Sequence, residues 1–581
     1  MSLKKQTSTL FLVILAVVTL GAWVSKLVDA RSPDYYYEVK KNIAVFGKVY
    51  EEISKRYVEE VDPEKFMRAG INGMLNTLDP YTVLVESEDN AEIKIMTSGK
   101  YGGLGMKISL RNGWPTVIEP PFSGTPALRA GIREGDQIIE IDGQTTKNLT
   151  ISQTAARLRG EVGTEVVVKI RREGEEQPLE FRLIRAEIII KDIVYSGLVK
   201  EGIGYIKLSH FSKNAGREIH EAISDLKAKG IKSLILDLRQ NPGGLLESAV
   251  EVADNFIEKG KLIVSTEGRA EGSVQKYYAK QDPIFGNWPL IILVDTTSAS
   301  ASEIVAGAIQ DLDRGLVVGS PTFGKGLVQT IIPISRDAAL KMTTAKYFIP
   351  SGRLIQKPEV FETGKQTVFM AQQKDQQIES DKTDEEELQE AKLEKKKPVY
   401  KTASGRIVYG GGGITPDVEV RLPLLNPYQF ELIRKSMLFN FALVYATKHP
   451  ELPRGFTVDE KMIEAFKSFL KEKNFQYRSP METQLQELEK TAKDSGYLER
   501  VSPHIEALRK IVAEETEKEF YNNLSFIKRS LERELSAKLW GTDAEVEASF
   551  DDDPVIIKAV EILSEPGRYS QYLEKRSTQG D

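Results

Sequence analysis

Residues 290–304 read LIILVDTTSASASEI. The apolar run Leu290–Val294 is typical of a buried strand, and the small residues after it indicate a turn that leads into a helix. Side chains at such a turn stand clear of the backbone, and the N–H groups of the helix start can stabilise a developing negative charge. A serine here suits a nucleophile, although serine is also a common helix cap. The stretch alone leaves Ser298, Ser300 and Ser302 as candidates.

Strands and helices alternate on both sides of this stretch. The predicted strands are Gly204–Leu208, Ser233–Leu238 and Leu290–Val294, and the predicted helices are Ala215–Lys229, Leu246–Lys259 and Ser302–Asp311. Such alternation is the signature of an α/β fold. We therefore expect an α/β core over residues 190–424. Residues 371–397 within it are charged, rich in Gln and poor in aromatic residues, so we expect a solvated insert there.

Two loops of this core have compositions that suit a hydrolase. Residues 322–329 read TFGKGLVQ, and the glycines on either side of Lys325 let the backbone fold tightly around it. Burial can lower the pKa of a lysine until it serves as the base for a serine hydroxyl, although exposed turns also contain Gly-Lys-Gly. Residues 236–244 read LDLRQNPGG, and such glycines let bare N–H groups approach a substrate carbonyl, as an oxyanion hole requires. A plain β–α loop is the alternative.

Four ordered motifs resemble those of the carboxyl-terminal processing proteases, also called tail-specific proteases. The resemblance covers residues 35–425, and its strongest matches are Ser298–Ile304, Thr322–Gly326 with Gln329, Asn241–Gly244 and Gly412–Asp417. In this family the nucleophile lies 25 residues before the lysine, a spacing that selects Ser300. The resemblance therefore implies a Ser–Lys dyad of Ser300 and Lys325, with Gln329 orienting the base.

The same resemblance implies the rest of the site. Backbone N–H groups of Gly243 and Ala301 are expected to form the oxyanion hole, and Asp311 matches a helix aspartate to which we assign a structural role. The family's core resembles the crotonase fold, so we expect a crotonase-like α/β protease core that uses neither a cofactor nor a metal. The expected activity is that of a serine-type endopeptidase.

Residues 99–186 resemble a PDZ domain, placed before the protease core. Its carboxylate-binding loop is matched by Gly103, Leu104, Gly105 and Met106, after which the order of short strands, Ala-Gly-Ile, Gly-Asp and Asp-Gly follows the PDZ pattern. In such a loop, consecutive backbone N–H groups hold a chain terminus, and the bound peptide adds a strand to the sheet edge. The expected partners are therefore protein substrates with free, apolar C-termini, cut by the dyad upstream of the captured tail.

Three other interpretations of the sequence compete with a tail-cleaving protease. A Ser/His/Asp triad would need one of only four histidines, and His210 with Asp237 is the best candidate pair. An intact PDZ domain on an inactive protease core would be a tail-binding scaffold. An enoyl-CoA-hydratase-like enzyme would share the core fold, but the sequence contains no nucleotide-binding feature to support it. The absence of cysteine excludes disulfides, thiolate metal sites and a cysteine nucleophile.

The N-terminus has the pattern of an export signal. Lys4 and Lys5 precede the apolar run Leu10–Val24, and Val28–Ala30 ends with the small residue that a signal peptidase reads. Residues 1–30 are therefore expected to be a signal peptide or an uncleaved inner-membrane anchor, with the rest of the chain in the periplasm. A net charge of −6 argues against nucleic acid as a partner.

Helical patterns flank the two central domains. Residues 35–95 are expected to form an N-terminal helical region, and residues 425–581, rich in Glu, Lys and Leu, a C-terminal helical domain. A homo-oligomer or an adaptor contact through these regions stays open. The predicted class is thus a multidomain α/β and β protein, in which the PDZ domain precedes the α/β protease core.

Overall fold

The computed structural model describes residues 33–86, 95, 97–111, 113–122, 124–172, 175–270, 272–335, 338–357, 397–565 and 567–574. The chain divides into two units, Met1–Leu78 and Asp79–Asp581. The predicted signal or anchor at residues 1–30 lies outside the described residues, as does the 371–397 insert except for Lys397. Within the described ranges, no helix has both the length and the apolar character needed to cross a membrane.

The described part of the first unit consists of two helices, α2 (Pro33–Arg56) and α3 (Pro63–Leu75). The start of α3 is set by Asp62, whose carboxylate accepts hydrogen bonds from the N–H groups of Glu64 and Lys65. Pro63 supplies the first helical position, where its missing N–H costs nothing. The helical prediction for residues 35–95 does not hold throughout, because Val83–Glu86 in the second unit forms a strand, β1. Its β-branched valines pair with a neighbouring strand instead of extending a helix.

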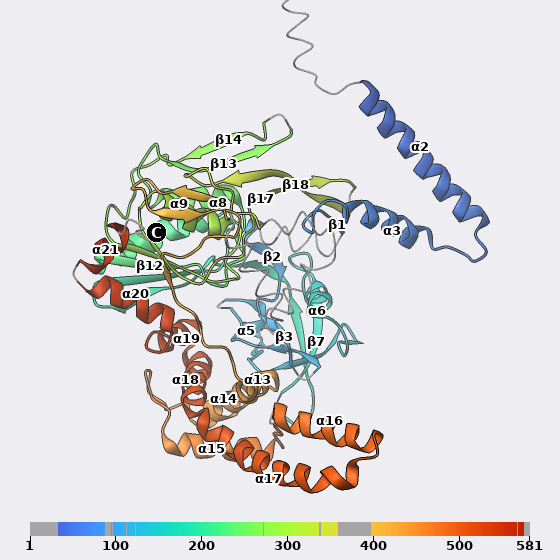
Figure 1. Cartoon of the computed structure of the whole chain (residues 1–581), viewed down its shortest axis with the longest axis vertical. Helices are drawn as coiled ribbons and strands as arrows, with labels where there is room; N and C mark the ends of the chain where they lie inside the picture. The colour runs from blue at the N-terminus through green and yellow to red at the C-terminus, as the bar shows by residue number, and fades with distance from the viewer. Residues whose placement is uncertain are drawn as a thin grey trace, which may run out of the picture. The chain divides into compact units, whose positions relative to one another are not determined.

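A six-stranded sheet, of which β12 is labelled in Figure 1, forms the core of the protease region. Its order is β10 (Ile193–Lys200), β11 (Ile203–Leu208), β12 (Ser233–Asp237), β15 (Leu290–Val294), β16 (Leu316–Gly319) and β21 (Val418–Glu419). The strands from β11 to β21 run parallel, and β10 is antiparallel at one edge. The predicted α/β class is confirmed. Because β12, β15 and β16 are neighbours, the loops that follow them meet at one edge of the sheet.

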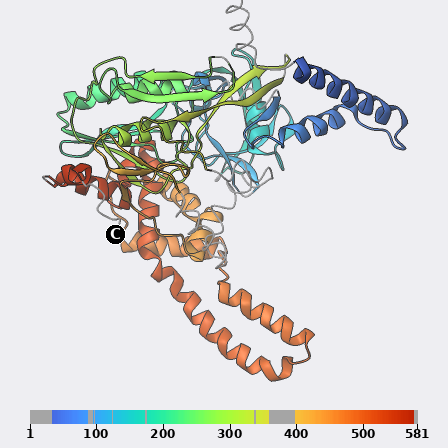
Figure 2. The same cartoon turned by 45° about the horizontal axis from the view of Figure 1, so that its top comes forward.

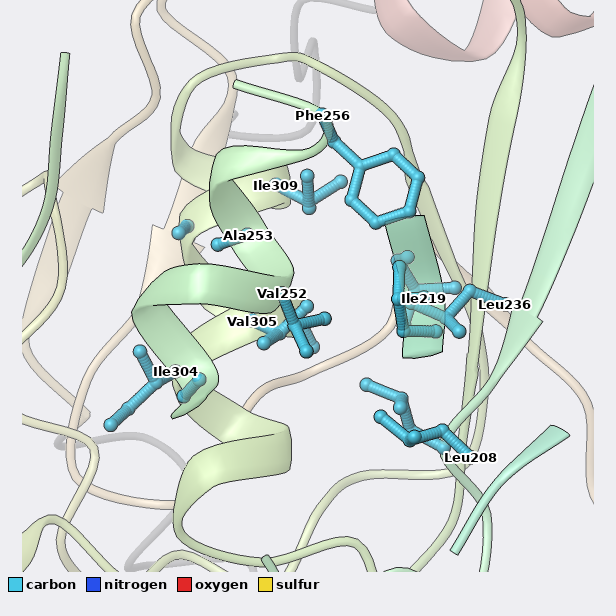
Figure 3. Packing of buried hydrophobic residues seen from close by; sticks show 14 of the residues in the cluster. Leu208, Ile219, Leu236, Val252, Ala253, Phe256, Ile304, Val305 and Ile309 are labelled. Carbon is cyan, nitrogen blue, oxygen red and sulfur yellow. The ribbon is translucent and has the colours of Figure 1, made fainter. Parts of the chain in front are cut away.

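Three helices cover one face of this sheet: α7 (Ala215–Ala228), α8 (Leu246–Asp254) and α9 (Ala301–Asp311). Figure 3 shows Ile304, Val305 and Ile309 of α9 packed beside Val252 and Ala253 of α8. All eleven residues of α9 are buried, so this helix is a fixed support for the turn that precedes it.

A second sheet, in which every pair is antiparallel, has the order β1–β18–β13–β14, with β17 paired to β18. Its strands are β1 (Val83–Glu86), β13 (Leu262–Gly268), β14 (Gln275–Tyr278), β17 (Leu327–Pro333) and β18 (Ala338–Phe348). A separate two-stranded hairpin is formed by β19 (Val399–Lys401) and β20 (Ile407–Tyr409), which do not pair with this sheet. Strand β17 begins just after Lys325, so the sheet fixes the C-terminal side of the lysine loop.

The described residues of the PDZ region form two sheets and two short helices. Strands β3 (Ile108–Arg111), β4 (Trp114–Val117), β5 (Gln137–Ile141), β7 (Glu165–Arg171) and β8 (Leu179–Ile184) form one sheet, to which β6 (Gln144–Thr145) is added. Strand β2 (Lys100–Gly103) pairs with β9 (Ala186–Ile189). The helices are α5 (Pro126–Arg129) and α6 (Ile151–Leu158), and Leu158 belongs to the buried cluster of this domain.

The C-terminal helices divide between two cores. Helices α13 (Pro427–Arg434), α14 (Met437–Lys448), α15 (Glu460–Glu472) and α18 (Leu524–Trp540) share one cluster, with α16 (Pro480–Asp494) and α17 (Leu498–Asn522) as a helical hairpin, orange in Figure 2. By contrast, α19 (Thr542–Ala548), α20 (Pro554–Ser564) and α21 (Arg568–Glu574) pack with strands of the central sheet. The end of the region predicted as one helical domain, 425–581, therefore completes the protease core.

A buried ion network joins α20 to the central sheet. The guanidinium of Arg239 donates to Asp237 at 2.6 Å and to Asp553, the N-cap of α20, at 2.8 Å. The side chain of Asp237 is fully buried. Because Arg239 neutralises both carboxylates, α20 is tied to the loop that contains the Asn-Pro-Gly-Gly motif.

Replacing Arg239 with alanine is expected to lower the free energy of unfolding by about 3–5 kcal/mol, because it leaves a buried, unpaired carboxylate. Thermal unfolding followed by circular dichroism measures this change. Arg217→Ala is the matched control, since its ion pair with Glu221 is exposed and is expected to contribute less than about 1 kcal/mol. Equal effects of the two substitutions would show that the network has no special role in stability.

Candidate active site

The turn between β15 and α9 separates the three candidate serines. The side chains of Ser298 and Ser302 are fully buried, and their hydroxyls donate to the carbonyls of Leu238 and Asn241 at 2.8 and 2.9 Å. These two serines therefore fasten the turn to the loop after β12. Ser300 is partly exposed and lies at φ 56° and ψ −113°, a conformation that is costly for a residue with a Cβ. The differences in burial and in hydrogen bonding of the hydroxyl therefore distinguish Ser300 from Ser298 and Ser302, independently of its spacing from Lys325.

Lys325 lies in the loop between β16 and β17. Its Nζ donates to Gln329 Oε1 at 3.0 Å, so the structure brings these two predicted residues together. Burial, helped by the nearby charge of Lys341, lowers the pKa of Lys325 to about 8, against an opposing effect of Glu303 and Asp79. A lysine with this pKa is partly neutral near physiological pH, which a general base requires. Within the described residues, no hydrogen bond joins Lys325 Nζ to the Ser300 hydroxyl.

One buried carboxylate connects the two loops. Glu303, in the first turn of α9, accepts from the N–H groups of Ser300 at 2.9 Å, Gly324 at 2.7 Å and Lys325 at 2.9 Å. It also accepts from the hydroxyl of Thr322 at 2.6 Å. Its side chain is fully buried, and burial raises its pKa while these hydrogen bonds oppose the shift. The backbones of Ser300 and Lys325 are therefore held by the same group.

A second connection runs through Tyr347 on β18. The phenol is buried, and its oxygen lies within hydrogen-bond distance of the carbonyl oxygens of Ser300 and Lys325. Glu303 thus accepts from the N–H groups of these two residues while Tyr347 contacts their carbonyls. The sequence contained a signal for Glu303, because Ser300-x-x-Glu303 has the spacing of a capping box. It contained none for Tyr347, which is 47 residues from Ser300.

The two backbone N–H groups predicted to form the oxyanion hole differ in whether they already have a hydrogen-bond acceptor. The N–H of Gly243 donates to Asn241 Oδ1 at 2.9 Å, so it is already used inside the loop. The N–H of Ala301, at the start of α9, has no acceptor among the described residues. The two groups are close, because a Cβ on Gly243 would lie 2.8 Å from Ala301 N. Gly243, at φ +97°, therefore has to be a glycine for the turn and the loop to meet.

The predicted carboxylate-binding loop follows strand β2. The N–H groups of Leu104, Gly105 and Met106 have no acceptor in the part of the chain that the structure describes. Gly103 ends β2, and Leu104 is buried in the PDZ core. Three consecutive free N–H groups match what a chain terminus needs.

The structure does not assemble the rival triad. His210 Nδ1 lies 3.1 Å from Ser209 Oγ, and burial lowers the pKa of His210. Asp237 is occupied by Arg239 and by the hydroxyl of Tyr205 at 2.5 Å. Among the described residues, no hydrogen bond connects His210 to Asp237. Asp311 forms a buried ion pair with Arg353 at 2.7 Å, as a structural residue would.

No group of three or more His, Cys, Asp or Glu side chains able to hold a metal ion occurs within the described ranges.

Four protein-family models match the chain. Peptidase family S41 matches residues 202–363, and the PDZ domain matches residues 117–172. The C-terminal helical domain of a probable PDZ-protease matches residues 428–563, and the N-terminal domain of activating protease CtpB matches residues 24–89.

Two curated proteins with similar sequences are named as processing proteases. The carboxy-terminal-processing protease of Bartonella bacilliformis is 38% identical over 345 residues, which is 59% of this chain and 79% of that protein. The carboxyl-terminal-processing protease of a Synechocystis species is 37% identical over 292 residues, or 49% of this chain and 68% of that protein. Among solved structures, a photosystem II D1 C-terminal processing protease matches 54% of this chain and 90% of its own, with 27% identity and a TM-score of 0.32.

Proposed function

Because this chain belongs to the carboxy-terminal-processing protease family, whose members are serine-type peptidases, we propose that it captures the C-terminal tails of proteins through its PDZ domain and cleaves them with a Ser300–Lys325 dyad. The observation that carries the dyad is the division of the three serines. Ser298 and Ser302 are buried with both hydroxyls donated to carbonyls, whereas Ser300 is partly exposed beside the loop of a buried lysine.

In the proposed reaction, Ser300 Oγ attacks the scissile carbonyl carbon while its proton passes to Lys325 Nζ. The peptide C–N bond then breaks, and the leaving amine takes that proton. Water then attacks the acyl carbon while Lys325 takes one of its protons. The bond between that carbon and Ser300 Oγ breaks, and Lys325 returns the proton to Oγ, which restores the hydroxyl. Gln329 orients the lysine through its 3.0 Å hydrogen bond. The Ala301 N–H has no acceptor within the described ranges, so it is available to the oxyanion.

Two contacts support a resting form that substrate completes. Lys325 Nζ donates to Gln329 and, among the described residues, makes no hydrogen bond to Ser300, while the Gly243 N–H is used by Asn241. Lys325 Nζ has to come within hydrogen-bond distance of Ser300 Oγ, with its bond to Gln329 kept, before it can accept the proton. The Gly243 N–H has to turn away from Asn241 before the oxyanion can receive a second N–H. We propose that a tail bound at Gly103–Met106 provides the free energy for this change.

The test is cleavage of an unfolded reporter protein that ends in apolar residues. Wild-type protein is expected to cut it, and Ser300→Ala is expected to leave it intact while still binding its tail. If the two proteins behave alike, the protease assignment of Ser300 is wrong. If wild type binds the tail and never cuts any such reporter, the chain acts as a tail-binding scaffold.

Tail capture predicts a specific loss at Gly105. A side chain there would place its Cβ 2.3 Å from Thr125 Cγ2, at a residue with φ +78°. Gly105→Val is therefore expected to raise the Kd of a fluorescent apolar tail peptide at least about 10-fold, as measured by anisotropy, because the loop has to shift its N–H groups. Gly113→Val is the control, since Gly113 has φ +79° and open space around its Cβ position. Equal losses for both variants would contradict a binding role for the loop.

We also propose export to the periplasm, with residues 1–30 as a signal peptide or an inner-membrane anchor. The support is the order of two lysines, an apolar run and a small residue in the sequence. Cell fractionation with mass spectrometry of the N-terminus tests both forms. The molar mass of the purified protein in solution tests whether the chain forms a homo-oligomer through its helical regions.

A further inference from the structure

Lys325 has a second contact that the proposed reaction does not use. Its Nζ lies 4.7 Å from the centre of the Tyr81 ring, in addition to its hydrogen bond with Gln329. An ammonium within about 6 Å of an aromatic face is attracted by the negative electrostatic potential that the ring quadrupole creates at that face. The base is therefore held between an amide oxygen and an aromatic ring.

The ring of Tyr81 is fixed by the turn in which it lies. Asp79 Oδ1 accepts from the N–H groups of Tyr81 at 2.9 Å and Thr82 at 3.0 Å, and from the hydroxyl of Thr343 at 3.2 Å. Thr343, on β18, is the register partner of Gln329 on β17. The turn that holds Tyr81 is thus anchored directly beside the other contact of the lysine.

The hydroxyl of Tyr81 does not make this contact. It is buried and has no hydrogen-bond partner among the described residues. The interaction with Lys325 therefore comes from the ring, which a phenylalanine would retain and a leucine would not.

We infer that Tyr81 is a positioning residue for the base of the proposed reaction, holding the side chain of Lys325 against the face of its ring. This inference rests on the proposed function only in that Lys325 has to be the base. Its consequence is that Tyr81 favours the protonated form of Lys325, so the ring helps to determine the pH at which the base becomes neutral.

The direction of the effect follows from the groups around Lys325. Burial and the charge of Lys341 favour the neutral lysine, whereas Glu303 and Asp79 favour the charged one. Tyr81→Leu replaces the ring with a smaller apolar side chain and so removes the attraction of the ring for the ammonium, while Tyr81→Phe removes the hydroxyl alone. The protonated form then loses stability, and the acid limb of activity is expected to move down by about 0.5–1 pH unit.

The experiment compares the pH dependence of kcat/KM for reporter cleavage by wild type, Tyr81→Leu and Tyr81→Phe. Tyr81→Leu is expected to shift the acid limb to lower pH, and Tyr81→Phe to keep it at the wild-type pH. The control is Tyr521→Leu, which removes an exposed ring 4.5 Å from Lys467 on the C-terminal helices. An unchanged or raised acid limb in Tyr81→Leu overturns the inference.

A second measurement separates this inference from the proposed function. In the Ser300→Ala background, labelling of Lys325 by acetic anhydride at a series of pH values reports the neutral fraction of the amine by mass spectrometry. The labelling midpoint is expected to fall by about 0.5–1 pH unit when Tyr81→Leu is added. A fixed midpoint overturns the role of Tyr81 even if Ser300→Ala is inactive. A shifted midpoint supports that role even if the dyad assignment proves wrong.

Discussion

Replacing Lys325 with alanine is expected to lower kcat for tail cleavage by about 10⁴–10⁶-fold, while the Kd of a tail peptide stays within about twofold of wild type. The reduction is that of an enzyme that loses a residue of a nucleophile–base unit, where removing either member costs nearly as much as removing both. Lys325 is the proposed acceptor of the Ser300 proton, and burial lowers its pKa to about 8. Single-turnover kinetics with the reporter protein measure the chemical step directly.

Two further variants make this prediction specific. Lys325→Met removes the amine but fills most of the same buried space, so it is expected to be as inactive as the alanine variant with an unfolding temperature at or above that of wild type. Lys467→Ala removes a partly exposed lysine of the helical domain and is expected to leave kcat unchanged. Activity above about 1% of wild type in both Lys325 variants would assign the base to another group.

The pKa of Lys325 also predicts how activity and stability depend on pH. Activity is expected to rise with pH up to about 8, as the folded-state lysine becomes neutral. Its ordinary pKa is 10.5, so between about 8 and 10.5 the unfolded chain binds more protons than the folded one. The contribution of this group to the free energy of unfolding therefore increases with pH across that window. Comparing wild type with Lys325→Met by denaturant unfolding at pH 7 and 10 isolates this contribution.

The parts of the site that sequence could predict are those written in one continuous motif. The three loops that meet at the sheet edge each follow a strand. The alternation of strands and helices in the sequence predicts this position for each of them. Ser300 was chosen among three serines only through a family spacing. The structure adds a physical difference between the three serines, since the hydroxyls of Ser298 and Ser302 donate to carbonyls of the loop after β12. Hydrogen bonds between loops that are about 60 residues apart leave no local pattern.

Other parts of the site depend on contacts that no local pattern encodes. Tyr347 and Tyr81 reach Lys325 from β18 and from the turn before β1, so neither lies near a motif. Strand β1 was predicted as helix because its strand character depends on pairing with β18. The sequence could not predict that α20 packs on the central sheet, because the amphipathic pattern of this helix fits a helical bundle equally well.

Glu303 is expected to have the second-largest effect on the enzyme. Its carboxylate accepts four hydrogen bonds, two of which come from the N–H groups of the proposed nucleophile and base. Glu303→Ala leaves these donors buried without an acceptor, so we expect a loss of about 3–5 kcal/mol in the free energy of unfolding. We also expect kcat to fall by about 10²–10³-fold, because the turn and the lysine loop lose their shared anchor.

Glu303→Gln separates the effect on the free energy of unfolding from the effect on kcat. The glutamine keeps the shape and one acceptor oxygen, but its NH₂ group would face N–H donors, so the anchor is only half restored. We therefore expect a smaller loss of stability than in Glu303→Ala with much of the loss in kcat retained. Glu247→Ala is the matched control, because Glu247 lies exposed in the first turn of α8. If Glu303→Gln had wild-type kcat and unfolding free energy, the shared anchor would not be needed. The alignment of Ser300 with Lys325 would then have to come from the other contacts between the two loops, such as Tyr347 and the hydrogen bond from the Phe323 N–H to the Ser298 carbonyl at 3.0 Å.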